Sequence, residues 1–98
     1  DFNRTANELV RQIRAYYPWP GCYIEIGSDR LKIIEAEVVL DQKIDRAKFD
    51  RFRDFPIIGA SKDALLLRTV QPAGKKPMSG NTFLRGYRNW NVLKIIED

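Results

Sequence analysis

The sequence has 98 residues and a net charge of +4, which suits a single domain with one core. Apolar residues make up 44% of it and charged residues 31%, which argues against a disordered or fibrous chain. It contains no histidine, which removes the usual general base and the commonest zinc ligand. Cys22 is the sole cysteine, so no internal disulfide can form, and we expect this residue to act as a small hydrophobe.

Membrane and secretory classes are also disfavoured by the order of the residues. No apolar run approaches the roughly 20 residues that a membrane-spanning helix needs. The first residues, Asp1 to Arg4, contain neither an initiator methionine nor a signal pattern. We therefore expect the chain to be a piece of a longer protein that does not enter a membrane.

A first helix is expected to begin at Thr5 and to end before Pro18. Thr5 and Glu8 fit a capping box, in which each side chain bonds to the backbone N–H of the other residue. Apolar residues then recur at helical spacing and form one stripe: Ala6, Leu9, Val10, Ile13 and Tyr17. Arg11 and Arg14 share a face and could contact a phosphate backbone, although a solvated helix face is the commoner explanation.

A turn and two strands should follow this helix. Trp19 stands between two prolines and is interpreted as an aromatic that packs into the core, with base stacking as the alternative. Alternating apolar and polar residues predict strands from Cys22 to Ile26 and from Leu31 to Leu40. The apolar phase of the second strand changes at Ile33 and Ile34, which predicts a β-bulge there.

The stretch from Asp41 to Phe55 gives a weak pattern, for which we expect a helical turn or an ordered loop. Interleaved aromatic and basic residues there could form a nucleic-acid surface or a packing cluster beneath a loop. These residues are Phe49, Arg51, Phe52, Arg53 and Phe55. The apolar runs from Pro56 to Ala60 and from Ala64 to Val70 predict a hairpin of two buried strands.

Gln71 to Met78 is expected to be a stiff loop that leads from this hairpin into a second helix. Two prolines restrict its backbone, and Gly74 permits a tight reversal. Lys75 and Lys76 are left at its tip. Adjacent ammonium groups on a stiff loop could bind phosphate, whereas paired surface lysines often serve only solubility.

The second helix should run from Gly80 to Tyr87, with Ser79 as its N-cap. Arg85 and Arg88 would then point away from its apolar face. A last short strand is expected from Asn91 to Ile96. No internal repeat or linker is visible within the chain.

Positive charge is concentrated in the last third of the sequence. From Asp1 to Asp63 basic and acidic residues balance, eleven of each, whereas the stretch from Ala64 to Ile96 contains no acidic residue. Its basic residues are Arg68, Lys75, Lys76, Arg85, Arg88 and Lys94. A segment of one sign is the pattern expected for a polyanion partner, although it also favours solubility.

No motif in the sequence points to catalysis. Glu35 and Glu37 would share the solvent face of a strand, whereas a catalytic carboxylate pair needs an enclosed site. Phosphate-binding loops, dinucleotide fingerprints and metal-ligand clusters are absent from the sequence. The chain alone is therefore not expected to be an enzyme.

Three separated motifs together resemble the C-terminal domain of methionyl-tRNA formyltransferases, in the order and with nearly the spacing of that family. They are Ile13-Arg14-Ala15-Tyr16 running into Pro18-Trp19-Pro20-Gly21, then Gln71 to Met78, then Phe83-Leu84-Arg85-Gly86. Ile33 to Ala36 fits the strand between them. The resemblance covers most of residues 1–98 and implies one domain. The implied fold is mainly β with flanking helices: an OB-like, partly open Greek-key β-barrel with an N-terminal helix and a helix after the Gln71 to Met78 loop.

The resemblance also implies a role. In this family the formyl donor is 10-formyltetrahydrofolate, and the catalytic Asn, His and Asp belong to a Rossmann-like N-terminal domain, so this chain would bind no cofactor. The domain would be a non-catalytic, monomeric module that holds initiator tRNA beside its N-terminal catalytic domain, in the cytoplasm or in an organellar stroma or matrix. The candidate tRNA-binding residues are Lys75, Lys76, Arg85, Arg88, Arg11 and Arg14.

One departure from the family pattern keeps an alternative open. The usual Pro-Gly-Thr strand segment is replaced here by the charged stretch from Asp41 to Phe55. Sugar-nucleotide formyltransferases and formyltetrahydrofolate dehydrogenases carry similar C-terminal domains without using tRNA. The chain could instead be a structural or interaction domain of such a small-molecule formyltransferase.

Overall fold

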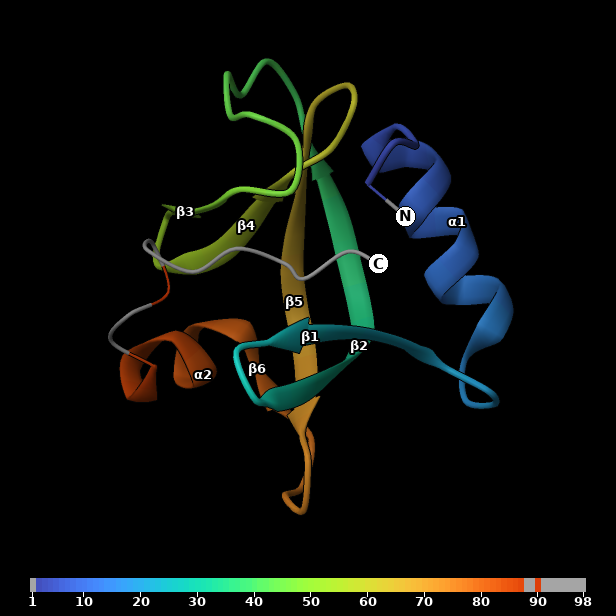
Figure 1. The fold of residues 1–98 in the computed structure, drawn as a ribbon, viewed down its shortest axis with the longest axis vertical. Helices are drawn as coiled ribbons and strands as arrows, with labels where there is room; N and C mark the ends of the chain where they lie inside the picture. Colours follow the sequence, from blue (N-terminus) through green and yellow to red (C-terminus); the bar gives the residue numbers. More distant parts are fainter. Residues whose placement is uncertain (1, 88–89, 91–98) are drawn as a thin grey trace.

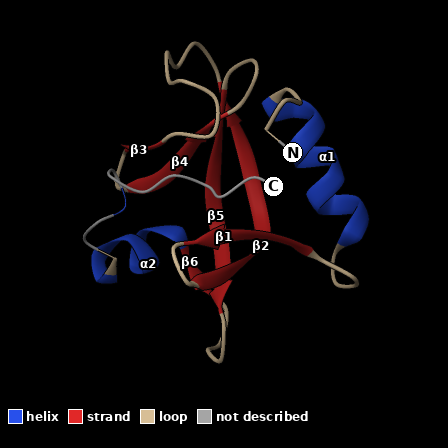
Figure 2. Cartoon of the chain, viewed as in Figure 1, coloured by secondary structure: helices blue, strands red, loops and turns tan. Residues whose placement is uncertain are grey.

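The fold is one antiparallel sheet flanked by two helices, and the computed structural model describes residues 2–87 and 90 of it (Figure 1, Figure 2). The elements are α1 (Ala6–Tyr16), β1 (Cys22–Ile26), β2 (Asp29–Val39), β3 (Phe49–Phe52), β4 (Phe55–Gly59), β5 (Ala64–Pro72), β6 (Met78–Ser79) and α2 (Gly80–Gly86). Neither helix is long and apolar enough to cross a membrane. The strand expected from Asn91 to Ile96 lies outside the described residues.

The sheet follows a Greek-key order. Its strands lie in the sequence β1-β2-β5-β4-β3, with β6 pairing onto β5. β3, β4 and β5 follow one another in the chain and lie side by side in the sheet. β2 precedes them in the chain and pairs with β5, the last of the three. Within the described residues no pairing joins β1 to β3, so the sheet does not close. The expected partly open, mainly β fold with flanking helices is thus confirmed.

α1 forms as its sequence predicts. The Glu8 N–H donates to Thr5 Oγ1 at 3.2 Å, and the Thr5 N–H donates to Glu8 Oε1 at 2.9 Å. The bond from the Thr5 N–H lowers the pKa of Glu8, so the contribution of this carboxylate is lost as the pH falls through that lowered pKa. The buried stripe packs against β2 and β5 and consists of Ala6, Leu9, Val10 and Ile13.

β2 contains the expected irregularity. Its pairing register with β5 shifts between Ile33 and Glu35 and again between Glu35 and Ala36. The shifts let Ile33 and Ala36 both face the core although they stand an odd number of positions apart. The predicted β-bulge is confirmed, and it lets the strand bend around the core.

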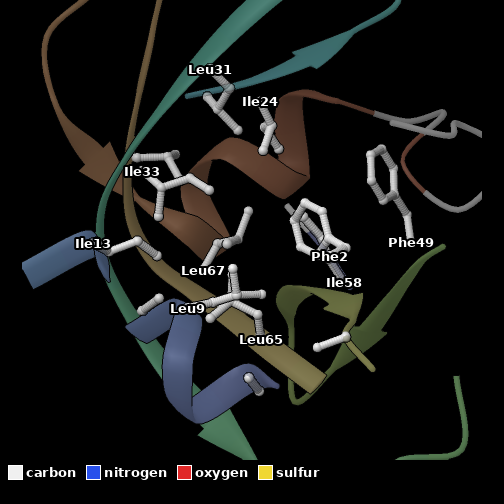
Figure 3. Packing of buried hydrophobic residues seen from close by; sticks show 14 of the residues in the cluster. Phe2, Leu9, Ile13, Ile24, Leu31, Ile33, Phe49, Ile58, Leu65 and Leu67 are labelled. Atoms are coloured by element: carbon white, nitrogen blue, oxygen red, sulfur yellow. The ribbon is translucent and has the colours of Figure 1, made fainter. Parts of the chain in front are cut away.

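The core lies between the sheet and the two helices (Figure 3). Every layer contributes buried side chains, including Phe2, Leu9, Ile13, Ile24, Leu31, Ile33, Phe49, Ile58, Leu65 and Leu67. Trp90 is fully buried among them: its ring stacks on Phe49 at a centroid distance of 4.1 Å, and its Nε1–H donates to the Asp50 carbonyl at 2.8 Å. Trp90 therefore ties the end of the described chain to β3.

The core position expected for Trp19 was wrong. The Trp19 side chain is 84% exposed, on the turn between α1 and β1. The buried aromatic cluster is built instead from Phe49, Phe83 and Trp90, with Phe83 meeting the Trp90 ring edge-on. The core therefore takes one tryptophan, and the other remains at the surface.

The stretch from Asp41 to Phe55 contains a strand that the sequence did not predict. β3 pairs with β4, from Phe49 opposite Ile58 to Phe52 opposite Phe55. Four residues are too short to show alternation, and the turn at Arg53 and Asp54 has positive φ values without the Asn-Gly signal typical of such turns. The sequence therefore did not predict β3, because the strand is short and its turn lacks the usual signal.

The aromatic residues of this stretch serve packing. Phe49 belongs to the main core, and Phe52 and Phe55 cover a small second cluster on the other face of the sheet. The buried members of that cluster are Ile57, Ala64 and Leu66. The packing alternative for these aromatics therefore matches the structure.

Substitution of Gly80, the first residue of α2, tests how closely this helix approaches the sheet. A Cβ there would lie 1.8 Å from the Leu67 carbonyl oxygen, whereas a Cβ at Gly86, in the same helix, would meet nothing within 4 Å. We expect Gly80→Ala to lower the free energy of unfolding by about 1–3 kcal/mol because the helix must move away. Gly86→Ala should change it by less than about 0.5 kcal/mol. Urea unfolding of both variants measures the difference, and equal values would contradict the close approach.

Thr5→Ala tests the capping box. Loss of the Thr5 hydroxyl should cost about 1 kcal/mol of stability, because the Glu8 N–H loses its acceptor. Asn7→Ala, at an exposed position of the same turn, is the matched control. Thermal unfolding at neutral pH should separate the two variants, and an unchanged stability in Thr5→Ala would show that the box does not stabilise α1.

Candidate nucleic-acid interface

The Gln71 to Met78 segment forms the tip of a β-hairpin. β5 continues to Pro72, and β6 returns to pair Met78 with Val70. The Lys75 N–H donates to the Pro72 carbonyl at 3.1 Å, and Gln71 Nε2 donates to the Lys75 carbonyl at 2.9 Å. The segment was expected to lead straight from strand to helix, but the strands on either side of it, β5 and β6, pair with each other first, so the tip is held at its base.

The turn itself agrees with the sequence. Gly74 has a φ of +75°, in the left-handed region that favours glycine. Lys75 and Lys76 follow it and are both exposed. The backbone hydrogen bonds of the turn fix where these two side chains start, so both ammonium groups leave the fold at one defined place.

The tip lies beside the hairpin of β1 and β2. β2 pairs with the end of β5, with Leu31 opposite Pro72 and Lys32 opposite Gln71, and the Ala73 N–H donates to the Arg30 carbonyl at 3.3 Å. The pairing brings the tip next to two further cations, Arg30 and Lys32, which are not among the residues predicted from the sequence. Their signal was present in the sequence, because they alternate with buried Leu31 and must face outward.

Two adjoining hollows connect these cations. One, of about 420 Å³, lies between the two hairpins and α2 and has Arg30, Lys75 and Tyr87 in its wall. The other, of about 220 Å³, is lined by Tyr23, Arg30, Lys32, Gln71, Pro72, Ala73 and Gly74. Arg30, Pro72 and Ala73 belong to both walls, so the two hollows adjoin.

Two side chains, Tyr87 and Cys22, have raised pKa values and so favour their neutral forms. Burial, and to a lesser extent the Asp29 carboxylate, raises the pKa of Tyr87, so its phenol stays neutral. Burial also raises the pKa of the Cys22 thiol, whose Sγ donates to the Gln12 carbonyl at 3.8 Å. No group of three metal-binding side chains occurs within the described residues. What this surface presents is fixed positive charge beside shallow apolar hollows.

The predicted site residues divide between two sides of the molecule. Lys75 shares a hollow with Gly86 and Tyr87 at the end of α2, and Arg85 is exposed in the last turn of that helix. Arg11 and Arg14 are exposed on α1, which lies on the opposite side of β5 from α2 (Figure 1). Arg88 lies outside the described residues. The structure therefore groups the hairpin with α2 and keeps the α1 arginines apart.

Comparison with known sequences identifies relatives over nearly the whole chain. A protein from Bacillus pumilus (strain SAFR-032) named methionyl-tRNA formyltransferase is 44% identical over 89 residues, covering 88% of this chain and 28% of the relative. Proteins of the same name from Pseudoalteromonas translucida (strain TAC 125) and Paramagnetospirillum magneticum (strain ATCC 700264 / AMB-1) are 35% and 39% identical, covering 92% and 89% of this chain.

The length of these relatives shows how much of them the chain represents. It spans 28% or 29% of each of the three, less than a third of their length. The sequence profile of one family, described as formyl transferase, C-terminal domain, matches residues 1–88. The match covers most of the chain and includes both hairpins and α2. The chain therefore belongs to the formyl transferase C-terminal domain family.

Proposed function

We propose that this chain is the non-catalytic tRNA-binding and positioning domain of a methionyl-tRNA formyltransferase. The enzyme would transfer a formyl group from 10-formyltetrahydrofolate to methionyl-initiator tRNA during translation initiation, in the cytoplasm or an organelle. The observation that carries the proposal is the hairpin tip, where Lys75 and Lys76 are fixed beside Arg30 and Lys32. The names of the relatives, which mention methionyl-tRNA, add to it.

The charges at this end of the fold support a polyanion partner. β5, its hairpin and α2 contain no acidic residue, and Arg68 is already paired with Glu37. Lys75, Lys76 and Arg85 remain as exposed cations. Lysine and arginine side chains bind phosphate oxygens and fix the register of a nucleic acid without reading its sequence. The proposed tRNA surface therefore runs from the hairpin tip towards α2.

The mechanism would be positioning. Formyl transfer would take place on a separate catalytic domain, which would bind the cofactor and supply every catalytic group. This domain would hold the tRNA so that the methionyl amine reaches the formyl donor in a reactive orientation. Arg11 and Arg14 on α1 would contact a different part of the tRNA from Lys75 and Lys76, because α1 lies on the opposite side of β5 from α2, with which Lys75 shares a hollow (Figure 1).

A second candidate function has its own observation. The outer face of the sheet carries a hollow of about 490 Å³ whose lining includes Leu40, Phe52 and Phe55, and Leu40 is 67% exposed. Apolar surface of this kind favours contact with another protein domain. The chain would then brace a formyltransferase that acts on a small molecule, and it would not bind RNA.

The salt dependence of tRNA binding separates the two functions. We expect initiator tRNA to bind the 98-residue chain more weakly as salt rises, because bound lysines release counterions from the phosphates. Lys75→Ala/Lys76→Ala should weaken binding and lower the slope of log affinity against log salt by up to about two. Filter binding or fluorescence anisotropy over a salt series measures both quantities.

A control with the same loss of charge is available at the other end of the fold. Lys43 and Lys62 are exposed on loops at the end of the sheet opposite the hairpin tip (Figure 1). Lys43→Ala/Lys62→Ala should leave the slope close to that of the parent chain. If no salt-dependent binding occurs at low ionic strength, the bracing function is favoured instead.

A further inference from the structure

We infer that Trp19, with Tyr17 and Tyr23 beside it, is a stacking site for an unpaired nucleotide whose phosphates contact Lys32 and Arg30. The inference rests on the proposed RNA-binding function and specifies which form of RNA this part of the surface takes. Arg30 and Lys32 belong to the interface described above, and the stacking role of the three aromatic residues is new to it. We name these five residues the aromatic–basic patch.

The patch begins with a group of aromatics that the core leaves outside. Of the five large hydrophobic residues that are exposed in the described part of the chain, four are aromatic and lie between the end of α1 and the start of β1. They are Tyr16, Tyr17, Trp19 and Tyr23. An isolated exposed hydrophobe needs no explanation, but four aromatics within one short segment indicate a contact surface.

Trp19 is presented by a fixed turn. The Gly21 N–H donates to the Tyr16 carbonyl at 2.8 Å and closes the turn, while Lys32 Nζ donates to the Pro18 carbonyl at 3.1 Å. Gly21 has a φ of +85°, and a Cβ there would lie 2.8 Å from Lys32 Cε. Glycine at this position therefore lets the Lys32 side chain pass under the turn. Because the backbone is already ordered, stacking on Trp19 would cost little further entropy.

Two cations stand directly against the aromatic rings. The Arg30 guanidinium carbon lies 4.1 Å from the centroid of the Tyr23 ring. Lys32 Nζ lies 5.7 Å from the Tyr17 centroid and 6.0 Å from the Tyr23 centroid. Glu25 lies opposite Arg30 in the β1–β2 register, so Lys32 supplies the net positive charge of the patch. A base and its phosphate need this combination of ring face and adjacent cation.

The patch is continuous with the hairpin tip. Tyr23, Arg30 and Lys32 line the same hollow as Gly74, the residue before Lys75. An RNA strand held by the tip could follow this hollow to the patch. The ring faces suit a single strand, because bases in a duplex are stacked on one another and cannot lie on a side chain. The positive charge of Lys32 and Arg30 complements the phosphates of RNA, which favours RNA over an apolar protein partner.

The two tryptophans allow a direct test in the 98-residue chain. Trp19 is exposed and Trp90 is fully buried, so acrylamide should quench the emission of Trp19 alone. The probe is single-stranded octa-adenylate, with a blunt RNA duplex as the comparison. We expect the single strand to protect Trp19 from acrylamide and the duplex to leave it exposed. Unchanged Trp90 emission reports that the fold is intact.

Substitution of Trp19 measures how much stacking on this residue contributes to the affinity for octa-adenylate. Trp19→Ala should weaken octa-adenylate binding by about 5- to 100-fold, and Trp19→Phe by less, since a ring is retained. Leu40→Ala removes another exposed hydrophobe from the opposite end of β2 and should leave binding unchanged. If Trp19→Ala binds octa-adenylate as tightly as the parent chain, the stacking site is wrong.

Whole tRNA distinguishes this failure from failure of the proposed function. If Trp19→Ala changes nothing while Lys75→Ala/Lys76→Ala still weakens tRNA binding, the patch proposal falls and the tRNA proposal stands. Trp19-dependent binding of octa-adenylate without any tRNA binding would uphold the patch and overturn the proposed function. If neither RNA binds at low salt, both proposals are overturned.

Discussion

The pairing of β5 with its neighbours is the constraint on which the rest of the structure depends. β5 pairs with β2 along its length, with β4 over its first three residues and with β6 near its end. Its first four residues are all buried, because Leu65 and Leu67 face the main core and Ala64 and Leu66 face the second cluster. A strand buried on both faces needs a continuous apolar run, and Ala64 to Leu67 supplies it.

The position of the candidate surface follows from this pairing. Because β2 remains paired with β5 as far as Leu31 and Pro72, the turn of the β1–β2 hairpin and the tip after β5 emerge at the same end of the sheet (Figure 1). Arg30 thereby shares a hollow with Lys75, and Lys32 shares one with Gly74, although these residues are far apart in sequence. The strand pairing thus brings together basic residues that are far apart in the sequence.

Local signals made much of the fold predictable from the sequence. The capping box at Thr5, the N-cap at Ser79 and the change of phase at Ile33 each depend on neighbours a few residues away, and each is present as predicted. β3 could not be predicted in the same way, because a four-residue strand exists only through its pairing with β4. The same limit applied to the two tryptophans, because local sequence does not show that Trp90 fills the core while Trp19 stays exposed on a turn.

The candidate site likewise contains residues that local sequence predicts and residues that only strand pairing places there. Lys75, Lys76 and Gly74 could be found from sequence because the turn that presents them is local. Arg30 and Lys32 were visible only as outward-facing strand residues, since their place beside the tip depends on the β2–β5 register. Two-dimensional NMR of the isotopically labelled chain, titrated with initiator tRNA at low salt, tests the whole surface at once.

In that titration we expect shifts at the amides of residues 73–76, at Arg30 and Lys32 and at the Trp19 indole. The Trp90 indole, which is buried and bonded to the Asp50 carbonyl, should not move. Shifts confined to the outer face around Leu40 and Phe55, or no shifts at all, would contradict the assignment of this end of the fold to RNA.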